Sequence, residues 1–144
     1  MKINFPIPPL LIFMKKTNKK KILIVDDDFF IRDIYSTVLK SEEFEVIMAE
    51  NGQEGLKKAL SETPDLILLD VLMPIEDGLT MLQKLRERND YGKKVPVILL
   101  TNLSAGNEDI IRKIAKTEPV YYIVKASLTP HQVVEKVKER MSII

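Results

Sequence analysis

Apolar and polar residues follow one another along this chain in blocks of two kinds, beginning at about residue 20. Short, mostly apolar runs of strand length cover residues 21–26, 45–49, 65–70, 95–100 and 120–124. Each run precedes a segment whose apolar residues recur every three or four positions, which is the period of an amphipathic helix. Strands that alternate with helices predict βαβ units, and hence a three-layer α/β fold with a doubly wound, five-stranded parallel sheet.

Apolar stripes and capping signals define the expected helices. Asn51 with Glu54 three residues later is typical of a helix start, and Thr129 with Pro130 and Gln132 marks the start of the last helix. We interpret the stripes as core positions rather than as cofactor sites. Their members are Ile31, Ile34, Tyr35, Val38 and Leu39; Leu56, Ala59 and Leu60; Leu79, Leu82 and Leu85; Ile110, Ile111, Ile114 and Ala115; and Val133, Val134, Val137 and Met141.

Polar residues that suit phosphate chemistry lie at the ends of four of these strands. The carboxyl ends of parallel strands share one edge of the sheet, where ligands bind in open α/β folds, so these side chains should meet. Taken alone, Asp70 is explained as well by a structural role, in which it ends a strand or begins a turn, as by a functional one. The whole group comprises Asp26, Asp27 and Asp28 after the first strand, Asp70 at the end of the third, Thr101 after the fourth and Lys125 after the fifth.

Clustered carboxylates repel one another unless a cation lies among them. Oxygen ligands without cysteine or histidine favour a hard ion, Mg²⁺ before Mn²⁺ or Ca²⁺. A carboxylate such as Asp70 can attack phosphorus and form an aspartyl phosphate. Mg²⁺ held by Asp26 and Asp27, with Lys125 as a second cation, would offset the charge of the phosphoryl group, and Thr101 would donate a hydrogen bond to it.

Four motifs together resemble those of a response-regulator receiver domain of the CheY-like type. They are Ile-Val-Asp-Asp-Asp at 24–28, Leu-Leu-Asp-Val-Leu-Met-Pro at 68–74 with Asp77-Gly78, Val-Ile-Leu-Leu-Thr at 97–101 and Tyr-Tyr-Ile-Val-Lys at 121–125. The resemblance covers residues 20–144 and implies a flavodoxin-like sheet of order 2-1-3-4-5. Because the last helix is expected to end near Met141, we expect a stand-alone response regulator of a two-component phosphorelay.

The resemblance also implies roles for individual residues and partners for the chain. The phosphodonor would be a histidine kinase or a histidine phosphotransfer protein, and an unknown downstream protein would bind the face built from helix 4, strand 5 and helix 5. The only catalysis would be self-phosphorylation and self-dephosphorylation. The implied roles are phosphoacceptor for Asp70, Mg²⁺ ligands for Asp26, Asp27, Asp70 and the Leu72 carbonyl, phosphoryl partner for Lys125, and switch residues for Thr101 and Tyr122.

The chain departs from the family pattern around the phosphoryl site. Ala126 stands where the family usually has proline after the lysine, and we expect a trans bond because a cis bond before a non-proline residue costs roughly 3–4 kcal/mol. Asn102 replaces the usual small residue after Thr101, and Leu103 follows it. Leu72 and Leu103 together are hypothesised to exclude or misplace the attacking water, which would make self-dephosphorylation slow.

Several other polar residues are given structural explanations. Asp28 is interpreted as a helix cap in preference to a metal ligand. Glu76 and Asp77 are placed in the loop before the third expected helix. His131, the only histidine, is expected at the surface without a catalytic role.

The N-terminal 19 residues are expected to be a poorly ordered extension. Residues 1–13 are apolar but contain three prolines and are too short to span a bilayer, and Met14 is an alternative start. The lysine-rich block at 15–21 is interpreted as a solvated linker rather than a phosphate or nucleic-acid patch. The net charge of +1 predicts no direct nucleic-acid or membrane partner, and the absence of cysteine fits a reducing, cytoplasmic location.

Two other classes of function remain open. One is a degenerate receiver that binds partners without taking phosphate. The other is a phosphohydrolase of the haloacid-dehalogenase type, which would want a second acid where this chain has Leu72. A transcription factor is disfavoured because no helix-turn-helix region is evident. The chain is expected to be either a monomer or a phosphorylation-dependent dimer.

Overall fold

A five-stranded parallel sheet forms the centre of the molecule, in a computed structural model that describes residues 19–73, 75–102 and 108–142. The strand order is β2-β1-β3-β4-β5, as predicted, and the fold class is confirmed. The expected N-terminal extension lies almost wholly outside the described residues. The strands are β1 (Lys21–Val25), β2 (Glu45–Ala49), β3 (Leu66–Asp70), β4 (Val97–Thr101) and β5 (Tyr121–Val124).

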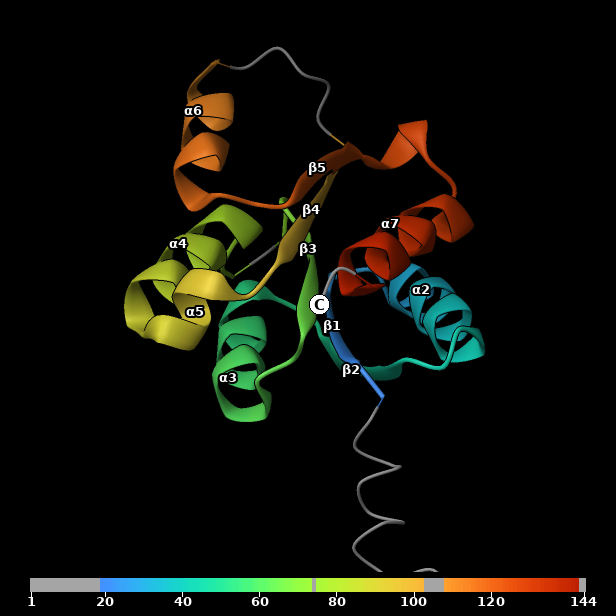
Figure 1. Cartoon of the computed structure of the whole chain (residues 1–144). Helices are drawn as coiled ribbons and strands as arrows, with labels where there is room; N and C mark the ends of the chain where they lie inside the picture. The colour runs from blue at the N-terminus through green and yellow to red at the C-terminus, as the bar shows by residue number, and fades with distance from the viewer. Residues whose placement is uncertain (1–18, 74, 103–107, 143–144) are drawn as a thin grey trace, which may run out of the picture.

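Helices cover both faces of this sheet and create two separate cores (Figure 1). Successive residues of β1 point to opposite faces, so Ile22 and Ile24 belong to the core beneath α2 and α7, while Leu23 and Val25 belong to the core beneath α3 and α4. The helices are α2 (Phe29–Ser41), α3 (Gly52–Glu62), α4 (Gly78–Arg88), α5 (Asp90–Lys94), α6 (Glu108–Thr117) and α7 (Pro130–Ser142), with a 3₁₀ turn at Lys125–Ser127.

Side-chain caps fix the starts of the helices nearest the carboxyl edge of the sheet. Asp28 accepts hydrogen bonds from the Phe30 and Ile31 amides, which confirms its predicted role as the cap of α2. Asn51 caps α3, and Asp77 caps α4 through the Thr80 amide. The reciprocal capping box of the last helix is confirmed, because the Gln132 side chain accepts from the Thr129 amide and the Thr129 hydroxyl accepts from the Gln132 amide.

Three details of the predicted elements are wrong. The short helix α5 was not predicted, and Val95, assigned to a strand, instead ends α5 by donating its amide to the Tyr91 carbonyl. Ile34 is 43% exposed because the inner face of α2 is centred on Arg32, Tyr35, Ser36 and Leu39. In α6, Ile111 and Ala115 are exposed, and Ile114 is buried.

Among the described helices, none is long and apolar enough to cross a membrane. All described peptide bonds, including the one between Lys125 and Ala126, are trans as expected.

Candidate functional site

Three carboxylates meet at the carboxyl edge of the sheet. Carboxylate oxygens of Asp26, Asp27 and Asp70 all lie within 4.8 Å of one another. β1 and β3 are parallel neighbours with Val25 opposite Leu69, so the residues that follow this pair arrive at the edge together. Asp26 and Asp70 are buried, whereas Asp27 is exposed, and the cluster is therefore open to solvent on one side.

Lys125 joins two of these acids from the far end of the chain. Its Nζ donates a hydrogen bond to Asp26 Oδ2 at 2.8 Å and lies 3.4 Å from Asp70 Oδ2. The 3₁₀ turn that begins at Lys125, directly after β5, places the side chain over the acids. Burial alone would lower the pKa of Lys125, but the hydrogen bond to Asp26 and the two negative charges outweigh it and raise that pKa.

Thr101 and Tyr122 occupy the neighbouring strands β4 and β5. Thr101 is fully buried as the last residue of β4, one position beyond Leu100, which pairs with Asp70. The fold thus brings Thr101 to the edge that holds the acids. Tyr122 is half-buried, pairs with Leu99 and packs against the core beneath α4.

The loop between β3 and α4 is fixed by main-chain hydrogen bonds. The Gly78 amide donates to the Val71 carbonyl at 2.9 Å, and the Gly52 amide donates to the Glu76 carbonyl at 3.0 Å. Leu72, at the start of this loop, is 55% exposed. Leu103, the second residue of the dephosphorylation hypothesis, lies outside the described residues.

The remaining polar residues keep their structural assignments. Asp28, the cap of α2, is outside the three-acid group, and His131 is exposed. Asp77 caps α4, and Glu76 forms an ion pair with Lys84.

The site residues fit a hard divalent cation. The pKa of Asp70 is raised to about 6, first by burial and then by the negative charge of Asp26, with Asp27 adding to it and Lys125 opposing it. A cation among the three carboxylates would relieve this repulsion. Three oxygen ligands with one solvent-open side match the preference of Mg²⁺, which binds few carboxylates and keeps several waters.

Without divalent cations, Asp70→Asn is expected to raise the free energy of unfolding near pH 7 by about 3 kcal/mol, at about 1.4 kcal/mol per pKa unit. The folded-state pKa of about 6 lies above the ordinary 3.8, so the folded wild type binds this proton more tightly than the unfolded chain. The wild type should therefore lose stability as the pH rises from about 4 to about 6.

Urea unfolding of wild type and variant in the presence of a chelator, from about pH 4 to pH 8, measures this difference. The gap between the two proteins should close toward the acidic end, and a gap that stays constant would contradict the prediction.

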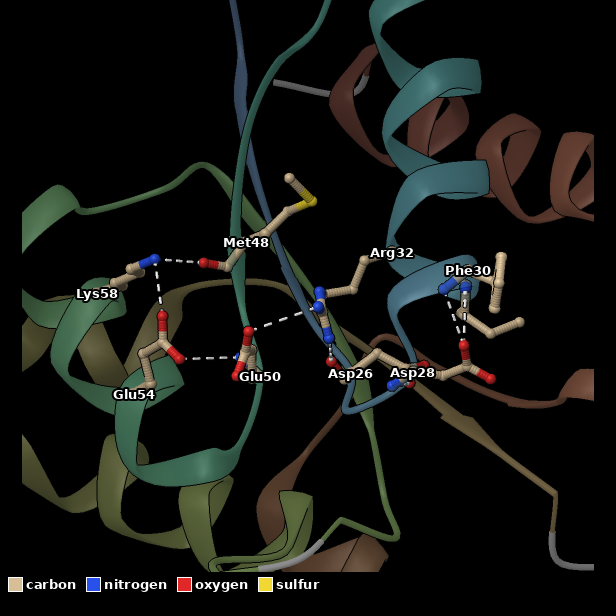
Figure 2. A network of polar contacts seen from close by, with 9 residues as sticks. Asp26, Asp28, Phe30, Arg32, Met48, Glu50, Glu54 and Lys58 are labelled. Carbon is tan, nitrogen blue, oxygen red and sulfur yellow. Dashed lines mark hydrogen bonds and ion pairs between the residues drawn. The ribbon is translucent and has the colours of Figure 1, made fainter.

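Sequence reasoning did not identify Arg32 as part of this site. Arg32 lies near the start of α2, is only 9% exposed, and donates from Nη1 to the main-chain carbonyl of Asp26 at 2.8 Å (Figure 2). The available signal was a charged residue within the apolar stripe of a helix, because such a residue is seldom buried without a partner.

Comparisons with known proteins agree with the geometry. The family model described as response regulator receiver domain matches residues 22–138. The transcriptional regulatory protein ResD of Bacillus subtilis (strain 168) is 38% identical over 108 residues, which are 68% of this chain and 43% of ResD. The chain therefore matches less than half the length of that relative.

Solved structures of similar proteins share the fold. A CheY-like receiver domain protein of Methanospirillum hungatei JF-1 has a TM-score of 0.77 at 30% identity, covering 87% of this chain and 95% of its own. A CheX–CheY–BeF₃–Mg²⁺ complex of Borrelia burgdorferi has a TM-score of 0.74 at 28% identity, covering 88% and 93%. With the family model matching most of its length, this chain belongs to the response-regulator receiver family of two-component signalling proteins.

Proposed function

We propose that this chain accepts a phosphoryl group on Asp70 from a phosphohistidine donor, in a reaction that requires Mg²⁺. The observation that supports it is the position of Asp70, whose carboxylate lies within 4.8 Å of those of Asp26 and Asp27 and 3.4 Å from Lys125 Nζ. A lone buried acid would be a poor target for an anionic phosphoryl group. Asp70 is a suitable target because the Lys125 ammonium lies beside it and the two other carboxylates could hold a second cation.

In the proposed reaction, a carboxylate oxygen of Asp70 forms a bond to phosphorus. The bond from phosphorus to the donor's imidazole nitrogen breaks, and its electron pair stays on that nitrogen. Asp26, Asp27 and Asp70 would hold Mg²⁺, with the Leu72 carbonyl as a further ligand, and the bound ion supplies positive charge for the phosphoryl oxygens. Lys125 and the Thr101 hydroxyl are proposed to bind the transferred group.

Signalling is proposed to use the surface of α6, β5 and α7, which corresponds to the expected helix 4–strand 5–helix 5 face. Phosphorylation adds negative charge at the edge where Thr101 ends β4. Thr101 and Tyr122 would follow that charge and shift the surface between two states that a downstream protein distinguishes. The cognate donor would be a histidine kinase or a histidine phosphotransfer protein.

The test is the intact mass of the full chain after incubation with a small acyl-phosphate donor, with Mg²⁺ or with a chelator. The proposal expects a gain of one phosphoryl group that depends on Mg²⁺. If the folded chain gains nothing from the small donor or from phosphohistidine, it is a degenerate receiver and the proposal fails. Continuous release of phosphate over many turnovers would instead indicate a phosphohydrolase.

Leu72→Asn is expected to shorten the lifetime of the aspartyl phosphate. Leu72 is 55% exposed in the loop that begins directly after β3, where its apolar side chain can keep water away from the phosphoryl group. An amide in its place would orient a water through one hydrogen bond, which is worth about 1 kcal/mol, or about fivefold in the rate of dephosphorylation. The decay of phosphorylated protein after donor removal measures it, and Leu72→Met serves as the apolar control. An unchanged lifetime in Leu72→Asn would contradict the hypothesis that Leu72 slows self-dephosphorylation.

A further inference from the structure

The Arg32 side chain connects the acid-bearing turn after β1 to a polar network on α3. Its Nη1 donates to the Asp26 carbonyl at 2.8 Å, and its Nη2 lies 3.6 Å from Glu50 Oε1. Figure 2 shows the guanidinium between these two residues, reaching across from α2. The Phe29 ring lies 5.8 Å from the guanidinium carbon and adds a cation–π contact.

Asp26 is held at its main chain as well as at its carboxylate. Its amide donates to the Ala49 carbonyl at 3.1 Å, which extends the pairing of β1 with β2 by one residue. Its carboxylate accepts from the Asp28 amide at 2.9 Å and from Lys125 at 2.8 Å. Arg32 therefore binds the main-chain carbonyl of a residue whose amide and side chain are already fixed.

The Asp26 carbonyl lies in the peptide plane that joins Asp26 to Asp27. Because a peptide unit is planar, fixing this oxygen also fixes the direction in which the chain leaves Asp26. That direction sets the position of Asp27, the exposed member of the three-acid group. The hydrogen bond from Arg32 thus acts on the peptide that joins two metal-binding candidates.

Glu50, which pairs with the guanidinium on the side away from Asp26, is itself connected to α3. The Glu50 amide donates to Glu54 Oε2 at 3.1 Å, and Glu54 forms an ion pair of 2.9 Å with Lys58. Lys58 also donates to the Met48 carbonyl, which closes the network on β2 (Figure 2). A planar guanidinium can bind Asp26 and Glu50 at once, whereas an ammonium is a single point of charge.

We propose that Arg32 is a positioning residue for divalent-cation binding, acting through the Asp26–Asp27 peptide rather than by touching the cation. The inference rests on the proposed function, because it concerns the same acids. Groups that orient metal ligands from behind typically change metal affinity by about 10–100-fold when they are removed.

The experiment titrates MgCl₂ into the full chain by calorimetry, for wild type, Arg32→Gln, Arg32→Lys and Glu50→Gln. Arg32→Gln is expected to bind Mg²⁺ about tenfold more weakly, and Arg32→Lys to fall between it and wild type. Glu50→Gln removes only the longer, solvent-exposed contact of 3.6 Å and keeps the bond to the Asp26 carbonyl, so its Mg²⁺ affinity should stay within about twofold of wild type. Urea unfolding without Mg²⁺ shows separately how much stability each variant has lost.

Wild-type affinity in Arg32→Gln would overturn the inference while leaving the proposed function intact. If Arg32→Gln does not fold, Arg32→Lys decides the matter: about threefold weaker binding supports the inference, and unchanged binding overturns it. A wild-type chain that binds no Mg²⁺ would overturn the proposed function, and the inference with it.

Discussion

Asp70→Asn is expected to take up no phosphoryl group from an acyl phosphate or from a phosphohistidine donor. Asp70 is the only one of the three clustered acids that ends a buried strand beside Lys125, Thr101 and the β3–α4 loop. An amide has nearly the shape of a carboxylate but lacks its nucleophilic oxygen, so the variant keeps the fold and loses the reaction. The expected effect is a complete loss within detection.

The measurement is intact mass with Mg²⁺ and donor, beside wild type and Asp77→Asn. Asp77 lies near the same edge and caps α4, and asparagine is an equally good cap, so this control should take up phosphate like wild type. A full phosphoryl gain in Asp70→Asn would contradict the prediction and show that another residue is the acceptor.

Gly78→Ala is expected to destabilise the fold by about 3 kcal/mol and to weaken phosphoryl uptake at the same time. A Cβ at Gly78 would lie 2.0 Å from the main-chain oxygen of Asp70 and 2.9 Å from its carbonyl carbon. Both atoms are main chain at the end of a central strand, so relief requires β3 or α4 to move. Either movement displaces the proposed phosphoacceptor.

Urea unfolding and the uptake assay measure the two effects of Gly78→Ala. Gly55→Ala is the matched control, because its Cβ would meet the side chains of Met81 and Val25 rather than main chain. Alanine also adds roughly 1 kcal/mol of helix propensity within α3. The control should lose less than half the stability that Gly78→Ala loses, and equal losses in both variants would contradict the argument.

The fold and the edge where the acids meet could both be predicted from local pattern. Continuous apolar runs mark strands buried on both faces, and parallel strands necessarily bring Asp26 and Asp70 to one edge. Capping by Asp28 and the box of Thr129 with Gln132 were equally accessible, because a cap depends on residues within one turn.

Features that depend on tertiary contacts could not be predicted in this way. The short helix α5 has local signals, an Asn89 cap and a lysine-rich last turn. Only Asn89 separates it from α4, however, so the sequence pattern does not distinguish it from a continuation of that helix. Ile34 fits the helical period as well as Tyr35 does, and only the docking of α2 decides which is buried. The contacts of Arg32 are with Asp26 and Glu50, which follow β1 and β2. The helical period of α2 gives no information about which residues of other elements Arg32 contacts.

The position of α7 has a consequence for how the protein is made. Val133, Val134 and Val137 of this helix are almost completely buried in the core that also contains alternate residues of β1, β3 and β4. Ribosomes release a polypeptide from its N-terminus, so Asp26 and Asp70 emerge well before α7 does. A nascent chain therefore leaves the part of this core that α7 covers exposed until the last helix is released, even though α2, on the same face of the sheet, has emerged long before.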